Sequence, residues 1–289
     1  MADVNSNELN IAHMRRRFDR AAGHFSNADF LHRTAADGLM ERIAPVNLKP
    51  ACIIDLGGGA GAGSRQLAKR FPRARILGLD LSAAMLRESH NARRWFSKVH
   101  EVQADARRLP FHDDSVDLVF ANMLLPWAGD PAAYLGEASR VLKTDGLFAF
   151  STLGPSSLAE IRDAWAAIDN GAHVKRFPDM HDIGDAVVRC GLVDPVLDVD
   201  YLTVTYRGVD ALFADITRSG ARNSLSIRRN TLTGKARFAR FRNQLQCGLQ
   251  DGLLNIRLEL VYGHAWGSTP RQSGSESRFA AEDIGRRRR

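Results

Sequence analysis

Cysteine is scarce in this chain of 289 residues, which contains only Cys52, Cys190 and Cys247. They lie too far apart to form a metal-binding or redox motif, so we expect no metal site and small buried thiols in a reducing compartment, the cytoplasm. Long apolar runs are absent as well. Because no stretch of about 18 apolar residues is present, no transmembrane helix is expected. The first residues also lack the pattern of a secretory signal.

Acidic residues are outnumbered, 33 against 40 lysines and arginines, which leaves a formal net charge of +7 at pH 7. A basic balance favours an acidic partner without choosing among nucleic acid, an anionic membrane and an acidic protein. Part of the charge lies in residues 268–289, a polar stretch without periodicity that ends in four arginines. We predict that this stretch is a disordered tail.

The apolar pattern divides the rest of the chain into three parts. Helical spacing over residues 8–44 predicts an N-terminal helical cap, residues 1–45. In residues 46–154, short apolar runs alternate with helix-like segments, which is typical of βαβ units and a parallel sheet covered on both faces. In residues 155–267, two long alternating strands at 196–208 and 253–267 flank a basic segment predicted to be helical over residues 209–250. We expect the two strands to close the sheet like a hairpin, with the inserted helices as a lid.

A glycine-rich turn follows the first predicted strand, in the stretch IIDLGGGAGAGSRQLAK. Gly57, Gly59 and Gly61 belong to a strand–turn–helix pattern that usually directs backbone N–H groups at a ligand. No Lys-Ser/Thr pair follows, which argues against a phosphate-binding P-loop. Asp55, two residues before the first glycine, suits a cationic amino group and would repel a pyrophosphate. The alternative is a tight turn without a ligand.

Two further acids end the next two predicted strands. Asp80 can accept both hydroxyls of a ribose. Asp105 can accept the exocyclic amine of an adenine, with the Ala106 N–H reaching a ring nitrogen, although Asp105 could instead cap a helix or turn. Acids for an ammonium, a ribose and an adenine match S-adenosylmethionine (SAM), which carries these three groups and no phosphate. The sequence therefore predicts SAM as the cofactor.

The motifs DLGGGAG, LDLS, ADARRLPF, VDLVFANMLL and ASRVLKTDGLFAF resemble those of the class I SAM-dependent methyltransferases. The resemblance implies an α/β, Rossmann-like fold with a mostly parallel seven-stranded sheet and an antiparallel last strand. It also implies cofactor contacts from Leu81, Met85 and Asn122. Phe18 could form a wall of the same site, or simply belong to the apolar core.

The flanking segments are more specific. FDRAAGHF, LSAAML, STLGPSSLAEIRDAWAAID, HVKRFPDMHDI, TGKARFARFRNQL and LVYGHAW resemble the malonyl-acyl-carrier-protein O-methyltransferases of biotin synthesis. The resemblance implies methylation of the free carboxylate of malonyl-acyl carrier protein, giving the ester that primes pimeloyl synthesis. The run Leu125-Pro126-Trp127 departs from the Gln-Trp ending that is common in this family.

The implied chemistry needs little acid–base help, because a malonyl carboxylate, with a pKa of about 4, is ionised at pH 7. The enzyme must mainly align the carboxylate with the methyl group. A carboxylate held away from water needs a cation or several donors. The candidates are His24 and Arg176, with His173 beside them. For each, an ordinary surface position is the alternative.

The predicted insertion is strongly basic between Asp215 and Gln244. Because acyl carrier protein is acidic, a basic lid would steer it electrostatically. We predict docking on Arg228, Arg229, Lys235, Arg237 and Arg240, by a monomeric enzyme. A solvated helix face is the alternative.

Three other functions are considered. A nucleic-acid methyltransferase would suit the charge, but the chain lacks the Asn/Asp-Pro-Pro-aromatic element, a cysteine for base attack and an RNA-binding module. The segments LKTDGLFAFSTLGPSSLAEIR and FPDMHDIGDAVVRCGL also resemble the complex I assembly factor that hydroxylates an arginine. A SAM-binding scaffold without activity is the third alternative. We expect neither nucleic acid nor membrane as a partner.

Overall fold

The computed structural model describes residues 8–93, 97–228, 231 and 233–268, and seven strands of these residues form one sheet. The strands lie in the order β3 (Val99–Gln103), β2 (Arg75–Asp80), β1 (Cys52–Leu56), β4 (Val116–Asn122), β5 (Leu142–Leu153), β7 (Leu254–Trp266) and β6 (Val193–Tyr206). The first five pair in parallel, whereas β7 is antiparallel to both of its neighbours. The predicted seven-stranded, mostly parallel sheet with an antiparallel last strand is confirmed.

Two apolar layers cover the two faces of the sheet. Consecutive residues of β1, Ile53 and Ile54, enter different layers, because successive side chains of a strand point to opposite faces. One layer includes α2 (Phe30–Arg42), α3 (Ala62–Arg70), α6 (Ala159–Ala166), α8 (Val209–Arg218) and α9 (Lys235–Cys247). The other includes α5 (Pro131–Val141) and α7 (Met180–Arg189). Burial on both faces explains why the central strands are almost wholly apolar.

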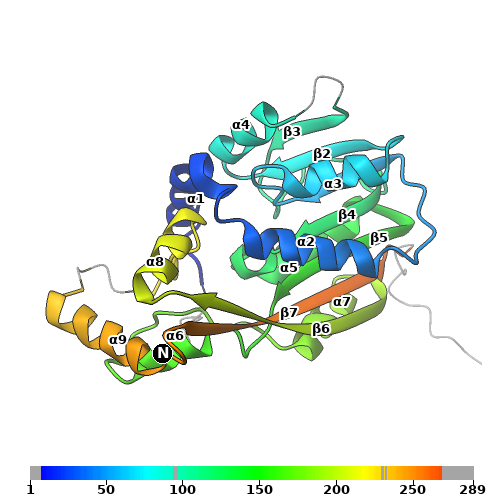
Figure 1. Ribbon diagram of the computed structural model, residues 1–289. Helices are drawn as coiled ribbons and strands as arrows, with labels where there is room; N and C mark the ends of the chain where they lie inside the picture. The colour runs from blue at the N-terminus through cyan, green and yellow to red at the C-terminus, as the bar shows by residue number, and fades with distance from the viewer. Residues whose placement is uncertain (1–7, 94–96, 229–230, 232, 269–289) are drawn as a thin grey trace, which may run out of the picture.

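The helix α1 (Ile11–Phe25) lies beside α4 (Ala83–Asn91) and α8, as Figure 1 shows. It begins where the Asn10 side chain accepts the N–H of His13. The inserted segment after α8 pairs with the chain before α1. The N–H of Asn10 donates to the Ser224 carbonyl at 2.8 Å, and the N–H of Ser226 donates to the Glu8 carbonyl at 2.8 Å. The insertion therefore fixes the start of α1.

The predicted helical insertion over residues 209–250 is only partly correct. It contains the two helices α8 and α9, and the described residues between them form turns and an isolated bridge. The break follows α8, where Gly220 adopts a φ of +74°, a left-handed conformation that ends helices. The third strand also ends at Gln103, before Asp105, so that Asp105 lies in the following turn.

None of the helices in the described residues is both long enough and apolar enough to cross a membrane. The same residues contain no group of three or more His, Cys, Asp or Glu side chains that could hold a metal ion.

Candidate active site

The glycine turn lies at the carboxyl end of β1 and is tied to β2. The N–H groups of Gly57 and Gly58 both donate to the Leu79 carbonyl, at 2.8 and 2.9 Å. Gly57, Gly59 and Gly61 all have left-handed φ values, between 53° and 78°. A Cβ on Gly61 would lie 2.2 Å from the Ser89 hydroxyl oxygen. Glycine is therefore required by conformation and by space at the start of α3.

Asp55 lies beneath this turn. Its side chain is 1% exposed and accepts a hydrogen bond from the Ser64 hydroxyl at 2.6 Å. Burial, reinforced by the charge of Asp80, raises its pKa to about 6, although the Ser64 bond opposes the shift. The carboxylate thus joins the turn to α3. Its predicted contact with an ammonium group stays a prediction.

Asp80 ends β2 and faces a cavity of about 930 Å³, measured out to its open mouth. Its two carboxylate oxygens accept the N–H groups of Gly59, at 3.0 Å, and Ser82, at 2.8 Å. Burial raises its pKa, while these two bonds partly offset the shift. Each carboxylate oxygen can accept a further hydrogen bond. Asp80 can therefore hold a ribose diol, and the site fits SAM.

The cavity gathers most of the predicted cofactor contacts at the carboxyl ends of the strands. Nine of the eleven line it: Phe18, Gly57, Gly59, Asp80, Leu81, Met85, Asp105, Ala106 and Asn122. Gly61 lines neither cavity and lies against Ser89 of α4, whereas Asp55 lines a smaller neighbouring cavity. The face of α1 that carries Ile11, Met14, Arg15 and Phe18 covers the larger cavity. Its walls are mostly apolar, which is typical of a small-molecule site.

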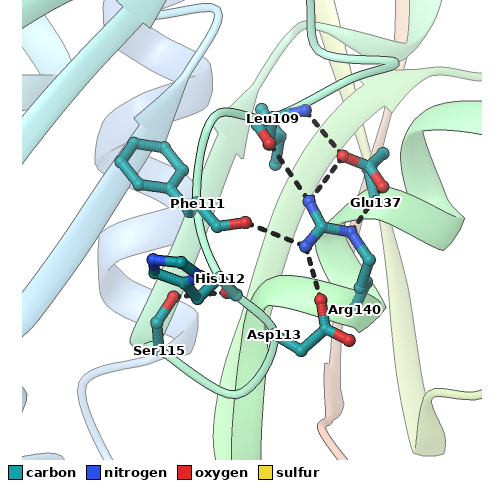
Figure 2. A network of polar contacts seen from close by, with 7 residues as sticks. All are labelled: Leu109, Phe111, His112, Asp113, Ser115, Glu137 and Arg140. Atoms are coloured by element: carbon teal, nitrogen blue, oxygen red, sulfur yellow. Dashed lines mark hydrogen bonds and ion pairs between the residues drawn. The ribbon is translucent and has the colours of Figure 1, made fainter.

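The end of the cavity predicted to hold adenine is formed by the turn after β3. Arg107 donates to both oxygens of Asp105, at 3.0 Å from Nε and 2.6 Å from Nη2, and this bonding lowers the pKa of Asp105. Figure 2 shows how Arg140 of α5 fixes the same loop further along. Its guanidinium donates to the Leu109 and Phe111 carbonyls and to the carboxylates of Asp113 and Glu137. The bonds from Arg140 therefore hold this loop against α5.

Asn122 serves as a link in the cavity wall. Its Nδ2 donates to the His32 carbonyl of α2 at 2.8 Å, and its Oδ1 accepts the Ser151 hydroxyl of β5 at 2.7 Å. The side chain thus joins β4, β5 and α2 at the point where the cavity begins.

The two residues predicted to hold the substrate carboxylate are not in the cavity. His24 and Arg176 are both exposed and line neither cavity. His24 points away because the inward face of α1 is taken by Phe18 and Phe25. His173 bonds to Asp169 at 2.7 Å and stacks on Trp165, with ring centroids 3.7 Å apart. Their predicted role in holding the substrate carboxylate stays a prediction, and their position outside both cavities does not support it.

Several further residues lie in or beside the cavity without any motif that marks them in the sequence. Arg15, His32 and Trp127 line the cavity, and the Trp127 ring packs edge-on against Phe18 at 5.1 Å. Lys175 lines neither cavity, but it donates to the Pro126 carbonyl, next to Trp127 of the cavity wall, at 3.0 Å. Burial lowers its pKa to about 8, and it forms no ion pair within the described part of the chain. The departure at residues 125–127 was the available signal, because it marked this wall as unusual.

The predicted docking residues are scattered. Arg228 contacts His13 Nδ1 of α1 at 2.8 Å, and Arg237 approaches Asp169 at 3.5 Å. Lys235 and Arg240 are exposed on α9. Arg229 lies outside the described residues.

Two comparisons with known proteins bear on the domain and its fold. Residues 54–150 match the family described as a methyltransferase domain. The YcgJ protein of Bacillus subtilis aligns with 81% of this chain and 99% of its own, at a TM-score of 0.59 and 17% identity, which supports the fold alone.

Relatives over nearly the whole chain are more specific. The malonyl-[acyl-carrier protein] O-methyltransferase of Gallionella capsiferriformans is 40% identical over 264 residues, covering 89% of this chain and 91% of its own. That of Laribacter hongkongensis is 39% identical over 279 residues, covering 93% and 94%. These matches cover about nine tenths of the chain, and the chain belongs to the malonyl-[acyl-carrier protein] O-methyltransferase family.

Proposed function

We propose that this protein methylates the free carboxylate of the malonyl group on acyl carrier protein, with SAM as methyl donor, to prime pimeloyl synthesis for biotin. The observation that carries the proposal is similarity to enzymes of that name over about nine tenths of the chain. The cavity supports it, because Asp80 and the glycine turn fit the cofactor. The relatives favour this activity over arginine hydroxylation and nucleic-acid methylation.

SAM supplies a methyl group activated by a positively charged sulfur. The residues of this chain bind the cofactor and orient the malonyl carboxylate toward its methyl group. Asp80 would hold the ribose, and the turn with Asp105 and Ala106 would hold the adenine. Phe18 and Trp127 form an apolar wall that excludes water from the reacting carboxylate. No general base is required, and the imidazole that lines the cavity, His32, has its pKa lowered to about 4 by burial. It is neutral at pH 7 and does not add charge.

Lys175 is our candidate for holding the malonyl carboxylate. Like Arg176 it lines neither cavity, but it is only partly exposed and its bond to Pro126 places it beside Trp127 of the cavity wall. Its side chain is largely removed from solvent, which lowers its pKa to about 8, and the Pro126 carbonyl is its acceptor. Two N–H donors remain without a partner in the described part of the chain. A buried cation without a counter-ion is costly, and a substrate carboxylate would supply one.

The partner is the acidic carrier protein. We propose that it docks on one chain acting as a monomer. All three cysteines are unpaired, which agrees with a cytoplasmic location.

Intact-mass spectrometry of the carrier tests the activity. Malonyl-acyl carrier protein incubated with enzyme and SAM should gain one methyl group, a mass of about 14 Da, in a reaction that orients an ionised carboxylate. Asp80→Asn should reduce this gain strongly and weaken SAM binding. Asp251→Asn, the same change in an exposed turn away from the cavity, should do neither. Binding of SAM without any mass gain by the unaltered enzyme would refute the proposed substrate.

A further inference from the structure

The start of α1 meets the inserted segment at a junction beside the cavity. The main chain of residues 8–10 bonds to that of residues 224–226, and Leu9 forms an isolated bridge with Leu225. An apolar cluster fills this junction, in which Leu9, Met14 and Leu225 are buried and Ile11, Phe18, Leu81, Trp127 and Ala172 pack against them. Met14, Phe18 and Trp127 also line the cavity. The junction is therefore continuous with the cavity wall.

Arginines gather at the junction without an acid to neutralise them. Two come from α1 and two from the inserted segment: Arg17, Arg20, Arg222 and Arg228. Burial lowers the pKa of Arg17, and the positive charges of the other three lower it further, so the four lie close together. None of the four forms an ion pair within the described part of the chain. Like charges held together in this way favour an anion between them.

Two of these arginines are half-buried and held in place by neutral groups. Arg17 donates to the Asn223 carbonyl and lies 3.4 Å from the Ser224 hydroxyl oxygen. Arg228 donates to Nδ1 of His13 at 2.8 Å, which requires that ring nitrogen to be unprotonated. Partial burial and the charges of nearby arginines lower the pKa of His13, which keeps the imidazole neutral at pH 7. Because a guanidinium has five N–H donors, both side chains keep donors for a ligand.

The proposed substrate carries a second anion besides its malonyl group. Acyl carrier protein holds the malonyl group as a thioester on a phosphopantetheine arm, and a phosphodiester joins this arm to the protein. The two free oxygens of the phosphodiester match the paired N–H groups of a guanidinium. Ile227, beside Arg228, is 40% exposed and can contact the dimethyl group that adjoins the phosphate. Half-buried guanidiniums in fixed positions suit this one group, whereas the surface carboxylates of a carrier can meet exposed cations such as Arg20 and Arg222.

The junction also connects these arginines to the candidate for the malonyl end of the arm. Asn223 Nδ2 donates to the Ala172 carbonyl at 2.8 Å. Ala172 lies in the loop between α6 and α7 that also carries Lys175, and Lys175 bonds beside Trp127 of the cavity wall. A malonyl group held by Lys175 would therefore place its arm along the apolar junction, with the phosphodiester toward Arg17.

We propose that Arg17 and Arg228 bind the phosphodiester at the base of the carrier's arm while the malonyl end of the arm lies at the cavity. This inference rests on the proposed function. It separates recognition of the arm, by the two half-buried arginines, from recognition of the carrier's acidic surface, for which the exposed Arg20 and Arg222 remain. The same site would take other phosphate esters of pantetheine.

Calorimetry with two fragments of the arm tests the site without turnover. Phosphopantetheine has the phosphate, whereas pantetheine is the same molecule without it. Enzyme saturated with S-adenosylhomocysteine should bind phosphopantetheine about tenfold more tightly, because a charge-assisted contact is gained. Arg17→Gln should remove this preference by weakening phosphopantetheine alone. Arg70→Gln is the matched control and should keep the preference, because the Arg70 guanidinium also bonds to main-chain carbonyls but lines neither cavity.

Kinetics separate the arm from the surface of the carrier and cover the case in which one variant folds poorly. Arg17→Gln and Arg228→Gln should each raise the KM for malonyl-acyl carrier protein by about fivefold or more and leave that for malonyl-pantetheine within about twofold. Equal rises for both substrates in both variants would overturn the assignment.

Two further outcomes are decisive. If the KM for the carrier rises while phosphopantetheine keeps its advantage over pantetheine in both variants, the arginines contact carboxylates of the carrier and the phosphate site is refuted. If phosphopantetheine binds selectively through Arg17 while malonyl-acyl carrier protein gains no methyl group, the phosphate site holds and the proposed substrate fails.

Discussion

Two basic surfaces border the insertion, and they differ in what neutralises them. The first, which we name the α1 cluster, consists of Arg17 and Arg20 of α1 with Arg222 and Arg228 of the inserted segment. The second, the α9 surface, consists of Lys235, Arg237, Arg240 and Arg242. On the α9 surface Arg242 pairs with Asp210, at 2.7 Å from Nη2 to Oδ2, and Arg237 approaches Asp169. In the α1 cluster no arginine pairs with an acid of the described residues.

The arginines of the α1 cluster are close enough to repel one another. Burial, together with the positive charges of Arg228, Arg222 and Arg20, lowers the pKa of Arg17. Arg17 itself bonds to the Asn223 carbonyl and lies near the Ser224 hydroxyl, both neutral groups. Like charges held together without acids lower stability, and an anionic partner would relieve this cost. The number of basic residues in a segment therefore says less about docking than the number left without an acid.

The position of the α1 cluster also favours it as the docking surface for the carrier. The adjacent face of α1 lines the cavity, and Leu225 of the inserted segment packs with Met14 of that face. The α9 surface lies farther away, beside α6 (Figure 1). An acidic carrier that delivers its malonyl group to the cavity should therefore meet the α1 cluster first.

The largest effect is expected from reversing charge in the α1 cluster. Arg20→Glu with Arg222→Glu, both at exposed positions, should raise the KM for malonyl-acyl carrier protein by about tenfold or more, because a steering patch becomes repulsive. Affinity for S-adenosylhomocysteine should stay unchanged by calorimetry. Lys69→Glu with Arg73→Glu, on the exposed side of α3 and the loop after it, is the matched control. A KM that rises equally in both double variants would remove the distinction between this cluster and charge in general.

A smaller effect is expected on the α9 surface. Lys235→Glu with Arg240→Glu reverses its two exposed cations that form no ion pair within the described residues. The KM for the carrier should rise by about two- to threefold, through long-range attraction that salt screens. Measuring the KM at low and high salt separates long-range attraction, which salt screens, from direct contact with the carrier. A larger rise than in the α1 cluster would place the carrier on α9, as the sequence analysis predicted.

The fold and the cofactor side of the site could be predicted because their signals are local in the sequence. Apolar runs that end in glycine or an acid mark the strands β1 and β2, and parallel strands bring Asp80 and the turn to one edge. The hairpin-like closure by β6 and β7 followed from their length and alternation. The strands, the turn and the closing hairpin are all set by residues that are close together in the sequence.

The substrate side could not be predicted in the same way. Helical spacing in α1 fits several orientations, and it did not show that Phe18 points inward while His24 is exposed. The partners that change the charge balance are far apart in sequence, such as Asp210 with Arg242 and Asp169 with Arg237. The docking prediction treated all insertion cations alike for this reason. Lys175 was missed because its environment depends on Pro126, which is far away in the sequence.

The smallest effect is expected from freeing one cation of the α9 surface. Asp210→Asn removes the acid that pairs with Arg242, so the α9 surface gains a positive charge without any added residue. The pair is exposed, with the Asp210 side chain 80% accessible, and exposed pairs contribute little to stability. The Tm should therefore hardly change in a thermal scan. If α9 is peripheral, the KM for the carrier should fall by less than about twofold, as expected for a distant screened charge. A steeper fall, with an unchanged Tm, would mean that the carrier touches α9 and that the ion pair normally weakens docking there.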